Sequence, residues 1–527
     1  RRIDTRRRCR GRGDGVAESA MKAMEESMET GAVALGSLID ALKGVVSDAP
    51  DAAARALSIT GVTADSRKAA PGFLFVAVKG TSVDGHHFMA DAAARGAVAV
   101  IAEQTPAQSS IPVITVTDSS KALALVASRF YGDPAHDLFL CGVTGTNGKT
   151  STTYLVRSIM ARTGRRMGII GTLGHGIDTL VKDPHTTPDA VTLHSWFRAM
   201  RDQHCFGVVM EVSSHAVRQH RVWGLDFNVG ILTNVTHDHL DFHKTMDDYI
   251  AAKSEFCHSL VAPGRRKANG TLVYWMDDAN ARNIGAAFGG AKIRVGSGSD
   301  ADWRLCDVDV SLAGTRFALA LPGGETLRVN MKLLGGFVPA NASVAAAAAF
   351  VSGATLEQIR DGLEAVARVP GRFEALGGGG KPVVIVDYAH TPDGFERVLA
   401  TCRALRPRRL VTVFGCGGDR DASKRPVMGA IAARESDRVY LTTDNPRSEK
   451  VEDIINDIRA GIPRQSDVVV ELDRADAIHA AVAESRSGDL VALLGKGHED
   501  YQLIGTRKLP FSDREQAEEA LASWPAA

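Results

Sequence analysis

Short apolar runs that end in polar or glycine-rich clusters recur along the chain from about residue 138 onward. Between residues 138 and 367, helical segments separate three of these runs, DLFLCGV, FGVVMEV and NVGILTNV. Uninterrupted apolar strands are typical of parallel sheets that are buried on both faces. The last region repeats the pattern in KPVVIVDYAH, RLVTVFGCGGD, RVYLTTDNPR and DLVALLGKGHE. Ligands of open α/β sheets bind outside the carboxyl ends of strands, so we expect the chemistry in these clusters.

Two joints divide the chain. YGDPAHD combines glycine with proline and is typical of a linker, and RVPGRFE is a second such joint. Before the first joint, the β-like runs GFLFVAVKG and GAVAVIAE flank a helical stretch, HHFMADAAARG. The pattern therefore predicts an α/β fold with three domains: a small α/β domain at 31–133, a central parallel-sheet domain with a phosphate loop at 134–367 and a Rossmann-like domain at 368–527.

The overall composition is that of a globular protein without an excess of either charge. Lys+Arg and Asp+Glu are both 62 in 527 residues, so nothing directs the chain to nucleic acid or to an anionic membrane. The seven cysteines have no CxxC spacing, which indicates reduced thiols in a cytoplasmic protein. The alanine-rich run at 342–354 is too short to span a membrane and predicts a buried helix. Residues 1–30 begin with an arginine-rich stretch and are predicted to be a disordered extension.

The stretch GVTGTNGKTST, residues 142–152, joins an apolar strand to a helical segment. Small residues in such a turn let backbone N–H groups face a phosphate, and the helix N-terminus adds positive potential. Lys149 would reach the β- and γ-phosphates, and the hydroxyl of Thr150 would join a Mg²⁺ shell. The glycine expected at Val143 stands instead at Gly145, so the loop is a variant of the common pattern. A glycine turn without a ligand is the alternative interpretation.

Acidic and histidine clusters follow two further strands. Glu211 in MEVSSHAVRQHR stands where a carboxylate can take a metal beside the phosphates, although a solvated loop is the simpler interpretation. TNVTHDHLDFH holds His237, His239 and His243, and its HxH spacing suggests zinc at first sight. The stretch has neither a cysteine nor an HExxH frame, and a phosphate loop is present. Mg²⁺ or Mn²⁺ at a nucleotide site therefore fits better than structural zinc.

Lys253 lies in the helical, semi-apolar segment YIAAKSEF. One interpretation is an exposed lysine whose stem covers apolar surface. The other is a buried lysine that is shifted toward the neutral amine and adds CO₂ to become a carbamate, which is an acidic metal ligand. The residues alone leave both interpretations open.

Seven motifs, taken together, resemble those of the Mur ligases. In order along the chain they are GVTGTNGKTS, MEVSSHAVRQHRV, TNVTHDHLDFH, DYAHTPD, FGCGGDRDASKRP, TTDNPR and GKGHEDYQ. The resemblance runs from about residue 55 to the C-terminus. It implies a first domain that binds the UDP end of the substrate, a second that binds ATP and a third that brings the amino acid.

The activity implied by the resemblance is ATP-dependent addition of meso-2,6-diaminopimelate to UDP-N-acetylmuramoyl-L-alanyl-D-glutamate. The product is a peptidoglycan precursor, formed through an acyl phosphate by a cytoplasmic, monomeric enzyme that requires Mg²⁺. One alternative is the same reaction with L-lysine, and another is a non-catalytic nucleotide-binding homologue. A folylpolyglutamate synthase-like ligase would lack DNPR and the DSR domain. A simple ATPase or transporter motor would leave the amino-acid motifs unexplained.

The resemblance also assigns residues to sites. ATP binding falls to Gly145, Thr146, Asn147, Gly148, Lys149, Thr150 and Ser151, with Lys149, His239 and Lys253 catalytic. Thr150, Glu211, His239 and carbamylated Lys253 would hold Mg²⁺. The UDP-muramoyl-dipeptide would contact Ala64, Ser66, Thr81, Ser82, Val83, Thr186, Thr187, Ser213, Gln219 and Arg221. Diaminopimelate would contact Arg420, Asp444, Asn445, Pro446, Arg447, Gly495 and Glu499.

The charges of the residues expected to bind the amino acid favour diaminopimelate over lysine. Diaminopimelate has one carboxylate more than lysine, and Arg447 offers a planar donor fork that pairs with a carboxylate. Asp444 and Glu499 would take the ammonium group, and a buried Arg447 facing lysine would be left unpaired. One position departs from the family pattern: His185 precedes the Thr186–Thr187 pair, where an asparagine is expected.

Overall fold

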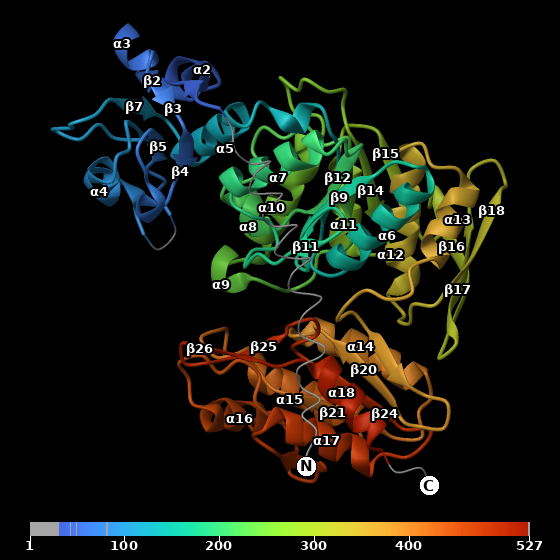
Figure 1. Ribbon diagram of the computed structural model, residues 1–527. Coiled ribbons are helices and arrows are strands. Elements are labelled where there is room, and N and C mark those ends of the chain that lie inside the picture. The colour runs from blue at the N-terminus through green and yellow to red at the C-terminus, as the bar shows by residue number, and fades with distance from the viewer. Residues whose placement is uncertain (1–30, 43, 49, 81–82, 525–527) are drawn as a thin grey trace, which may run out of the picture.

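The computed structural model describes residues 31–42, 44–48, 50–80 and 83–524. Three sheets with helices packed against them succeed one another along the chain, which confirms the α/β class. Figure 1 shows the first sheet in blue, the central one from green to yellow and the last in orange and red. The extension expected over residues 1–30 lies outside the described residues. The domain bounds given above stay a prediction.

The first domain is a five-stranded sheet in the order β2-β7-β6-β5-β4, parallel except for the pair of β2 with β7. Its strands are β2 (Val46–Asp48), β4 (Gly61–Thr63), β5 (Phe73–Val76), β6 (Ala99–Ala102) and β7 (Val113–Val116). Its helices are α2 (Leu35–Asp40), α3 (Ala52–Arg55), α4 (Met89–Ala94) and α5 (Ser119–Phe130). The strands β1 (Val33–Ala34) and β3 (Ser58–Ile59) form a separate antiparallel pair.

The central sheet has eleven strands in the order β11-β10-β9-β12-β8-β13-β14-β15-β16-β17-β18. Its middle, from β9 to β16, is parallel as predicted. The strands are β8 (Phe139–Thr144), β9 (Met167–Gly171), β10 (Gly174–Gly176), β11 (Leu180–Val181), β12 (Gly207–Glu211), β13 (Val229–Leu232), β14 (Thr271–Trp275), β15 (Lys292–Gly296), β16 (Trp303–Ser311), β17 (Gly314–Ala320) and β18 (Thr326–Met331).

Both edges of the central sheet are antiparallel, which the sequence interpretation did not anticipate. The reason is visible in β18, where buried and exposed residues alternate strictly. Such alternation belongs to a strand with one face on the core and one in water, whereas buried parallel strands are apolar throughout. At the β18 edge, the alternation therefore matches an antiparallel strand that is covered on one face only.

Two layers of helices cover the central sheet. One consists of α6 (Lys149–Arg162), α12 (Val338–Val351) and α13 (Leu356–Glu364), which pack with the strands into one core. The other contains α7 (Ala190–Asp202), α10 (Met246–Ser259) and α11 (Ala279–Ala287). Two short helices, α8 (Ser214–Arg218) and α9 (Leu240–His243), lie beside α10. Ala342 and the alanines at 345–349 in α12 are fully buried, which confirms the buried helix expected there.

The last domain is a six-stranded sheet in the order β19-β20-β24-β21-β22-β23, parallel except for β19. Its strands are β19 (Glu374–Gly377), β20 (Val383–Asp387), β21 (Leu410–Phe414), β22 (Arg438–Leu441), β23 (Val468–Val470) and β24 (Leu490–Leu494), with a hairpin of β25 (Tyr501–Ile504) and β26 (Arg507–Pro510). α14 (Pro392–Ala404), α15 (Lys424–Glu435) and α16 (Val451–Arg459) pack on one face, and α17 (Arg474–Glu484) and α18 (Asp513–Ala522) on the other.

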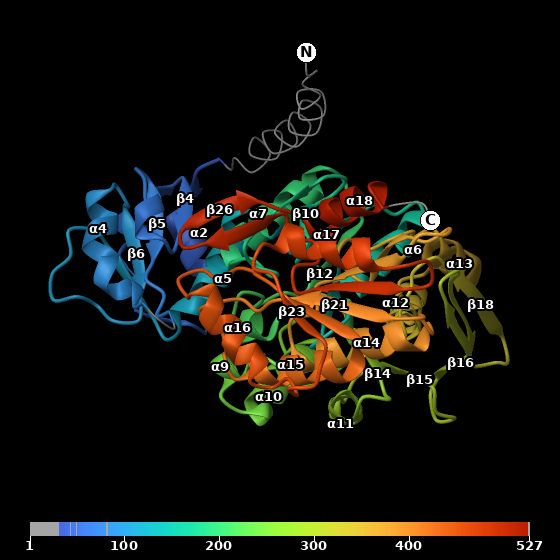
Figure 2. The same ribbon diagram turned by 90° about the horizontal axis from the view of Figure 1, so that it is seen from below.

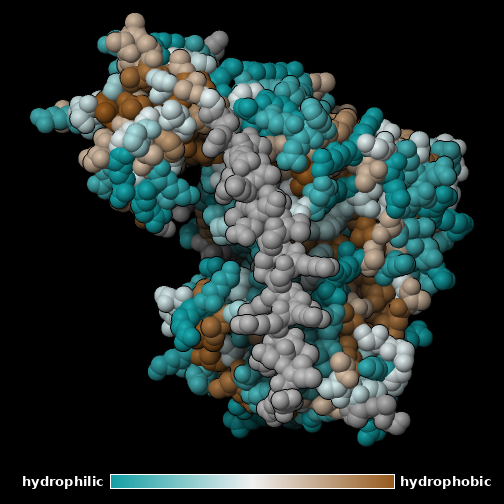
Figure 3. Space-filling view, in the orientation of Figure 1, coloured by the Kyte–Doolittle hydropathy of each residue, from teal (hydrophilic) through white to brown (hydrophobic). Residues whose placement is uncertain are grey.

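The last domain lies below the central one in Figure 1, and Figure 2 looks at the molecule from the side of the last domain. Hydrogen bonds join the two domains. Asn147 donates to Asp393 at 2.7 Å, and Arg372 donates to the Thr150 hydroxyl at 3.1 Å. Hydrophilic residues cover most of the face seen in Figure 3. Over the described part of the chain, no helix is both long and apolar enough to cross a bilayer.

Candidate active site

The phosphate-loop motif lies between β8 and the first turn of α6, at the carboxyl end of a central strand. Gly145 and Gly148 have φ angles of +145° and +87°, a region that side chains disfavour. A Cβ at Gly145 would lie 1.9 Å from Oγ1 of Thr233, and one at Gly148 would lie 2.3 Å from Oδ1 of Asn341. Both positions therefore require glycine, and the approach of Thr233 explains why the first glycine is at 145.

Lys149 folds back over the loop that precedes it. Its Nζ donates to the carbonyls of Gly145 and Thr146, both at 2.8 Å. Burial lowers the pKa of Lys149, while Glu211 and Asp238 act in the opposite direction. The loop places this lysine at the N-terminus of α6, where the helix dipole favours negative charge.

One cavity unites most of the predicted nucleotide and metal residues. Its lining includes the whole 145–151 loop and Glu211, His239 and Lys253 from the central domain. The last domain contributes Arg372, Asp387, Tyr388, His390 and Arg397 to the same cavity. Groups from two domains thus face a common space, which suits a reaction between two substrates.

Glu211 is the last residue of β12 and is 1% exposed. Its Oε1 accepts from the backbone N of Thr172 at 2.8 Å, and its Oε2 accepts from the Thr172 hydroxyl at 3.1 Å. His239 has a φ of +55°, and burial lowers the pKa of its imidazole to about 4. A neutral imidazole and a fixed carboxylate, both lining the cavity, are suitable metal ligands.

The neighbouring histidines do not complete a zinc centre. The ring of His243 is engaged on both sides, by the Ser214 hydroxyl at 2.9 Å and by Asp248 at 3.1 Å. His237 is exposed. Within the described ranges, no group of three or more His, Cys, Asp and Glu side chains is arranged to hold a metal ion.

Lys253 is buried, with 1% of its surface exposed, so it does not cover the protein surface as the first interpretation supposed. Its Nζ lies 4.4 Å from the centre of the Tyr249 ring. Burial, reinforced by the charge of Lys149, holds the pKa of the Lys253 ammonium well below its usual range. The side chain therefore lines the cavity as an amine that gives up its proton readily.

The residues predicted to hold the muramoyl-dipeptide form a connected group beside Glu211. The Thr187 hydroxyl donates to the backbone carbonyl of Glu211 at 2.9 Å, and the backbone N of Ser213 donates to Thr187 at 3.1 Å. Arg221 donates to the Thr187 carbonyl at 2.6 Å and to the side chain of Gln219 at 2.6 Å.

Thr186 touches the Thr172 hydroxyl at 3.1 Å and thereby joins the group around Glu211. His185 is exposed, and its backbone N donates to Asp183 at 2.8 Å.

The predicted uridine residues lie apart from this cavity. Ala64 and Ser66 follow β4 at its carboxyl end, and Val83 is 59% exposed. Thr81 and Ser82 lie outside the described residues. No described residue of the first domain lines the cavity.

The predicted amino-acid residues gather at the carboxyl ends of β21, β22 and β24. Asn445 donates to Glu499 at 2.8 Å, and Lys496 donates to the same two side chains at 3.2 and 3.0 Å. A Cβ at Gly495, where φ is +110°, would lie 2.7 Å from Oδ2 of Asp444. The 8% exposed Asp444 thus lies against the glycine turn.

Two arginines lie near the same strand ends. Arg447 has a φ of +53°, and its Nη1 donates to the carbonyl of Gly418 at 2.6 Å. A Cβ at Gly417 would lie 2.9 Å from that Nη1 and 3.9 Å from Cγ of Arg420, so both arginines border the same glycine. A Cβ at Gly418 would lie 1.9 Å from the carbonyl of Pro446, so the two loops meet without room for a side chain.

Three family models match the chain and together cover more than half of it. They are the Mur ligase family catalytic domain at 58–131, the Mur ligase middle domain at 143–349 and the Mur ligase glutamate ligase domain at 371–497. The chain belongs to the Mur ligase family. The resemblance found in the motifs is thereby confirmed, and the chain is an ATP-dependent ligase of this family.

Several relatives of this Mur ligase carry the name UDP-N-acetylmuramoyl-L-alanyl-D-glutamate–2,6-diaminopimelate ligase. The one from Bacillus cereus is 41% identical over 88% of this chain and 94% of its own length. The one from Aquifex aeolicus is 40% identical over the same shares of the two chains. A solved structure with that name matches with a TM-score of 0.67 and 30% identity, over 93% of this chain and 99% of the other. MurF from Acinetobacter baumannii, at 19% identity and a TM-score of 0.62, shares the fold.

Sequence reasoning missed several side chains that this Mur ligase places in the cavity or pocket. Arg372 was part of a joint, Asn341 immediately preceded the predicted buried helix and Asp238 was a neighbour of the histidines. Lys496, which is fully buried between Asn445 and Glu499, was passed over in GKGHED. The signal for Lys496 was a lysine between two glycines at the end of an apolar strand. Arg372 has no local signal, since its partner Thr150 is in another domain.

Proposed function

We propose that this Mur ligase adds meso-2,6-diaminopimelate to UDP-N-acetylmuramoyl-L-alanyl-D-glutamate and converts ATP to ADP and phosphate. The relatives that match nearly the whole chain carry that name. The observation that carries the proposal is the single cavity lined by the phosphate loop of one domain and by the Arg372 and Tyr388 side chains of the next. Because the reactants of such a reaction are cytoplasmic metabolites, we also propose that the protein acts in the cytoplasm, as a monomer.

The chemistry follows from the need to activate a carboxylate in water. An oxygen of the D-glutamyl carboxylate attacks the γ-phosphorus of ATP, the bond to the β-phosphate oxygen breaks, and ADP leaves. The amine of diaminopimelate then attacks the acyl carbon of this acyl phosphate, and a tetrahedral intermediate expels phosphate. Because the attacking oxygen and the phosphates are all anionic, cations have to offset their repulsion.

The residues of the cavity are suited to that task. Lys149 and the 145–151 backbone would hold the β- and γ-phosphates, and Arg372, which reaches Thr150 from the last domain, would meet the γ-phosphate side. Closure of the last domain would exclude water from the acyl phosphate. Thr186, Thr187, Ser213, Gln219 and Arg221 would orient the dipeptide, and Ala64, Ser66, Thr81, Ser82 and Val83 would hold the UDP end.

The donor set of the cavity fits Mg²⁺. It combines the Glu211 carboxylate, the Thr150 hydroxyl and a neutral His239 with Lys253, whose low pKa suits carbamate formation. Bound Mg²⁺ would supply positive charge beside the phosphates. An ammonium at Lys253 would repel a metal ion, whereas a carbamate would bind one.

Selection of the amino acid is proposed to rest on the two arginines. Arg447 and Arg420 border Gly417 and would pair with the carboxylate that lysine lacks. Asp444 would take the ammonium group, since Glu499 already accepts from Lys496 and Asn445.

A phosphate-release assay tests the function. Purified protein with ATP and UDP-N-acetylmuramoyl-L-alanyl-D-glutamate is expected to release phosphate with meso-diaminopimelate and about a hundredfold more slowly with L-lysine. Arg447→Ala is expected to lose most of the turnover with diaminopimelate and to keep its KM for ATP, because the lost cation faces the amino acid. Arg464→Ala, which removes an exposed arginine beyond α16, is the control.

Equal rates of phosphate release with L-lysine and with diaminopimelate would establish the alternative in which L-lysine is the amino acid added. ATP consumption that did not depend on the nucleotide-sugar would overturn the proposal, and absence of any turnover would favour a non-catalytic homologue.

A further inference from the structure

The two arginines proposed to bind the amino acid belong to two loops whose backbone conformation has to be stabilised by neighbouring residues. Arg420 is in the loop that follows β21, and Arg447 is in the loop that follows β22. Both loops contain backbone in the left-handed region, at Asp419 and at Arg447. A non-glycine residue holds such a conformation only when its surroundings impose it.

The support comes from a buried arginine in the first turn of α15. Arg425 is 2% exposed, and its Nη2 donates to the carbonyl of Gly417 at 3.3 Å. Two carboxylates accept hydrogen bonds from the terminal nitrogens of this guanidinium. Glu449 receives a two-pronged contact, at 2.8 Å from each terminal nitrogen, and Asp457 receives one bond at 2.8 Å.

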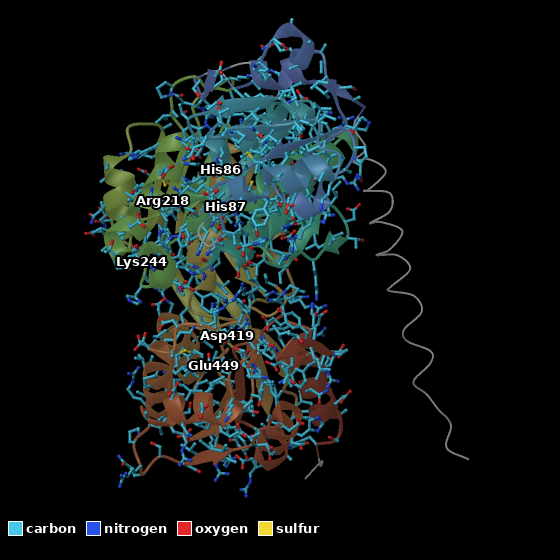
Figure 4. All side chains as sticks on the ribbon, turned by 90° about the vertical axis from the view of Figure 1, so that its left-hand side faces the viewer. His86, His87, Arg218, Lys244, Asp419 and Glu449 are labelled. Carbon is cyan, nitrogen blue, oxygen red and sulfur yellow. The ribbon has the colours of Figure 1, made fainter. Side chains whose placement is uncertain are left out.

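Only one of the two carboxylates also touches the glycine loop. Glu449 accepts a hydrogen bond from the backbone N of Asp419, and the side chain of Asp419 accepts from the Ser448 hydroxyl at 2.6 Å. Figure 4 labels Asp419 and Glu449 on the side of the last domain that faces the central one. Asp457 lies on α16 and receives its hydrogen bond from Arg425 alone among the described side chains.

We propose that Glu449 is a positioning residue of the amino-acid pocket: by joining Arg425 to the backbone of Asp419, it holds the 417–420 loop against the 444–449 loop, so that Arg420 and Arg447 face one carboxylate together. The inference rests on the proposed function, since it assigns the two arginines to the amino acid. Glu449 does not touch the substrate itself. It acts through the spacing of two guanidinium groups, and a bidentate contact depends on that spacing.

A pair of matched variants tests the inference. Glu449→Ala and Asp457→Ala each remove one carboxylate from Arg425, but only the first also removes the acceptor for Asp419. Glu449→Ala is expected to raise the KM for meso-diaminopimelate about tenfold, with kcat and the KM for ATP changed less than twofold. Asp457→Ala is expected to change all three less than twofold. Glu449→Gln keeps an acceptor oxygen and is expected to restore most of the affinity.

Equal effects of the two alanine variants would reduce Glu449 to a structural role and overturn the inference, and so would an unchanged KM in Glu449→Ala. Thermal unfolding of each variant shows whether it is folded, and Glu449→Gln keeps the test decisive if Glu449→Ala does not fold. Failure of the proposed function is distinguishable, because the unaltered protein would then show no turnover with diaminopimelate.

Discussion

At the scale of single residues, the side chain with the most unusual environment is Lys253. It is buried in the cavity close to the charge of Lys149, and its pKa lies well below the usual range. A lysine without its proton is a nucleophile for CO₂, and a lowered pKa favours that form, whereas an exposed lysine stays protonated. The environment thus supplies the physical requirement for a carbamate, which the sequence alone left open.

Replacement of Lys253 tests this at the residue scale. Lys253→Ala and Lys253→Arg are both expected to lower kcat at least a hundredfold, because neither side chain can form a carbamate and arginine keeps its positive charge. In the unaltered protein, ¹³C-labelled bicarbonate is expected to give a carbamate carbonyl signal in an NMR spectrum. Lys450→Ala, at an exposed lysine before α16, is the control.

Activity retained in Lys253→Arg would exclude the carbamate, because a fixed cation would then serve equally well. A carbamate signal that persisted in Lys253→Arg would show that another amine is modified.

The sequence indicated the cavity residues that stand in motifs and missed those that meet only in space. Glu211, His239 and Lys149 each follow a strand or begin a helix and were identified. Asn341 and Arg372 were not, because their partners lie far away along the chain. Asn341 is the clearest case, since it packs against Gly148 from a helix more than a hundred residues further along the chain.

At the scale of elements, α17 and α18 are tied together by an ion pair without solvent contact. Arg474 donates two hydrogen bonds to Asp513, both at 2.7 Å, and both side chains are 0% exposed. Arg474 also donates to the carbonyl of Leu494 at 3.0 Å, at the end of β24. The pair thus connects the two helices to the strand that leads into Gly495.

Breaking this pair on one side is expected to destabilise the last domain strongly. Asp513→Ala leaves a buried, uncompensated guanidinium and is expected to lower the free energy of unfolding by about 3 kcal/mol. The double variant Arg474→Met/Asp513→Leu removes both charges and is expected to recover most of that loss. Urea unfolding followed by circular dichroism measures both. A double variant no more stable than Asp513→Ala would contradict this account.

Helices and strands were predicted well where the apolar residues form a clear pattern along the chain, and less well at the edges of the sheets. The parallel strands β8, β12 and β13 and the helix α12 were identified because their apolar runs are uninterrupted, whereas the parallel strands β9, β14 and β15 were not named. The antiparallel strands β16, β17 and β18 were not, although GTRFALALPGGETLRVNM contains two alternating runs around a Pro-Gly-Gly turn, which is a hairpin signal. The sequence interpretation rested on continuous apolar runs, and strands with alternating residues do not contain such runs.

At the scale of the whole molecule, Asp393 connects the last domain to the central one. It lies in the first turn of α14 and accepts from Asn147 of the phosphate loop at 2.7 Å and from Thr236 at 3.1 Å. Arg397 on the same helix donates to it at 3.0 Å. One carboxylate therefore bonds two central loops, both of which line or border the cavity.

Loss of Asp393 is expected to loosen the docking of the two domains. Asp393→Ala is expected to increase the radius of gyration in small-angle X-ray scattering and to lower kcat/KM for ATP about tenfold, since two hydrogen bonds to a charged group are lost. Glu396→Ala removes an exposed carboxylate one turn further along α14 and serves as the control. An unchanged scattering curve together with unchanged kinetics would contradict this role.

The relative placement of the domains could not be predicted from the sequence. The Pro-Gly joints indicated where the chain is divided, but contacts such as that of Asp393 with Asn147 depend on how whole domains orient. The shared cavity, which carries the proposed function, is a property of that orientation.

The hydroxyl of Thr172 fixes the direction of the hydrogen bonds on one side of the cavity. A carboxylate only accepts, so the proton of the Thr172 hydroxyl points toward Glu211. The bond between Thr172 and Thr186 is therefore donated by Thr186, whose own proton is occupied. The oxygen of Thr186 therefore presents a lone pair to the cavity. It can accept a hydrogen bond from an amide N–H but cannot donate one to an oxyanion. Through two hydroxyls, Glu211 thus sets the direction of a hydrogen bond that Thr186 could form with a ligand.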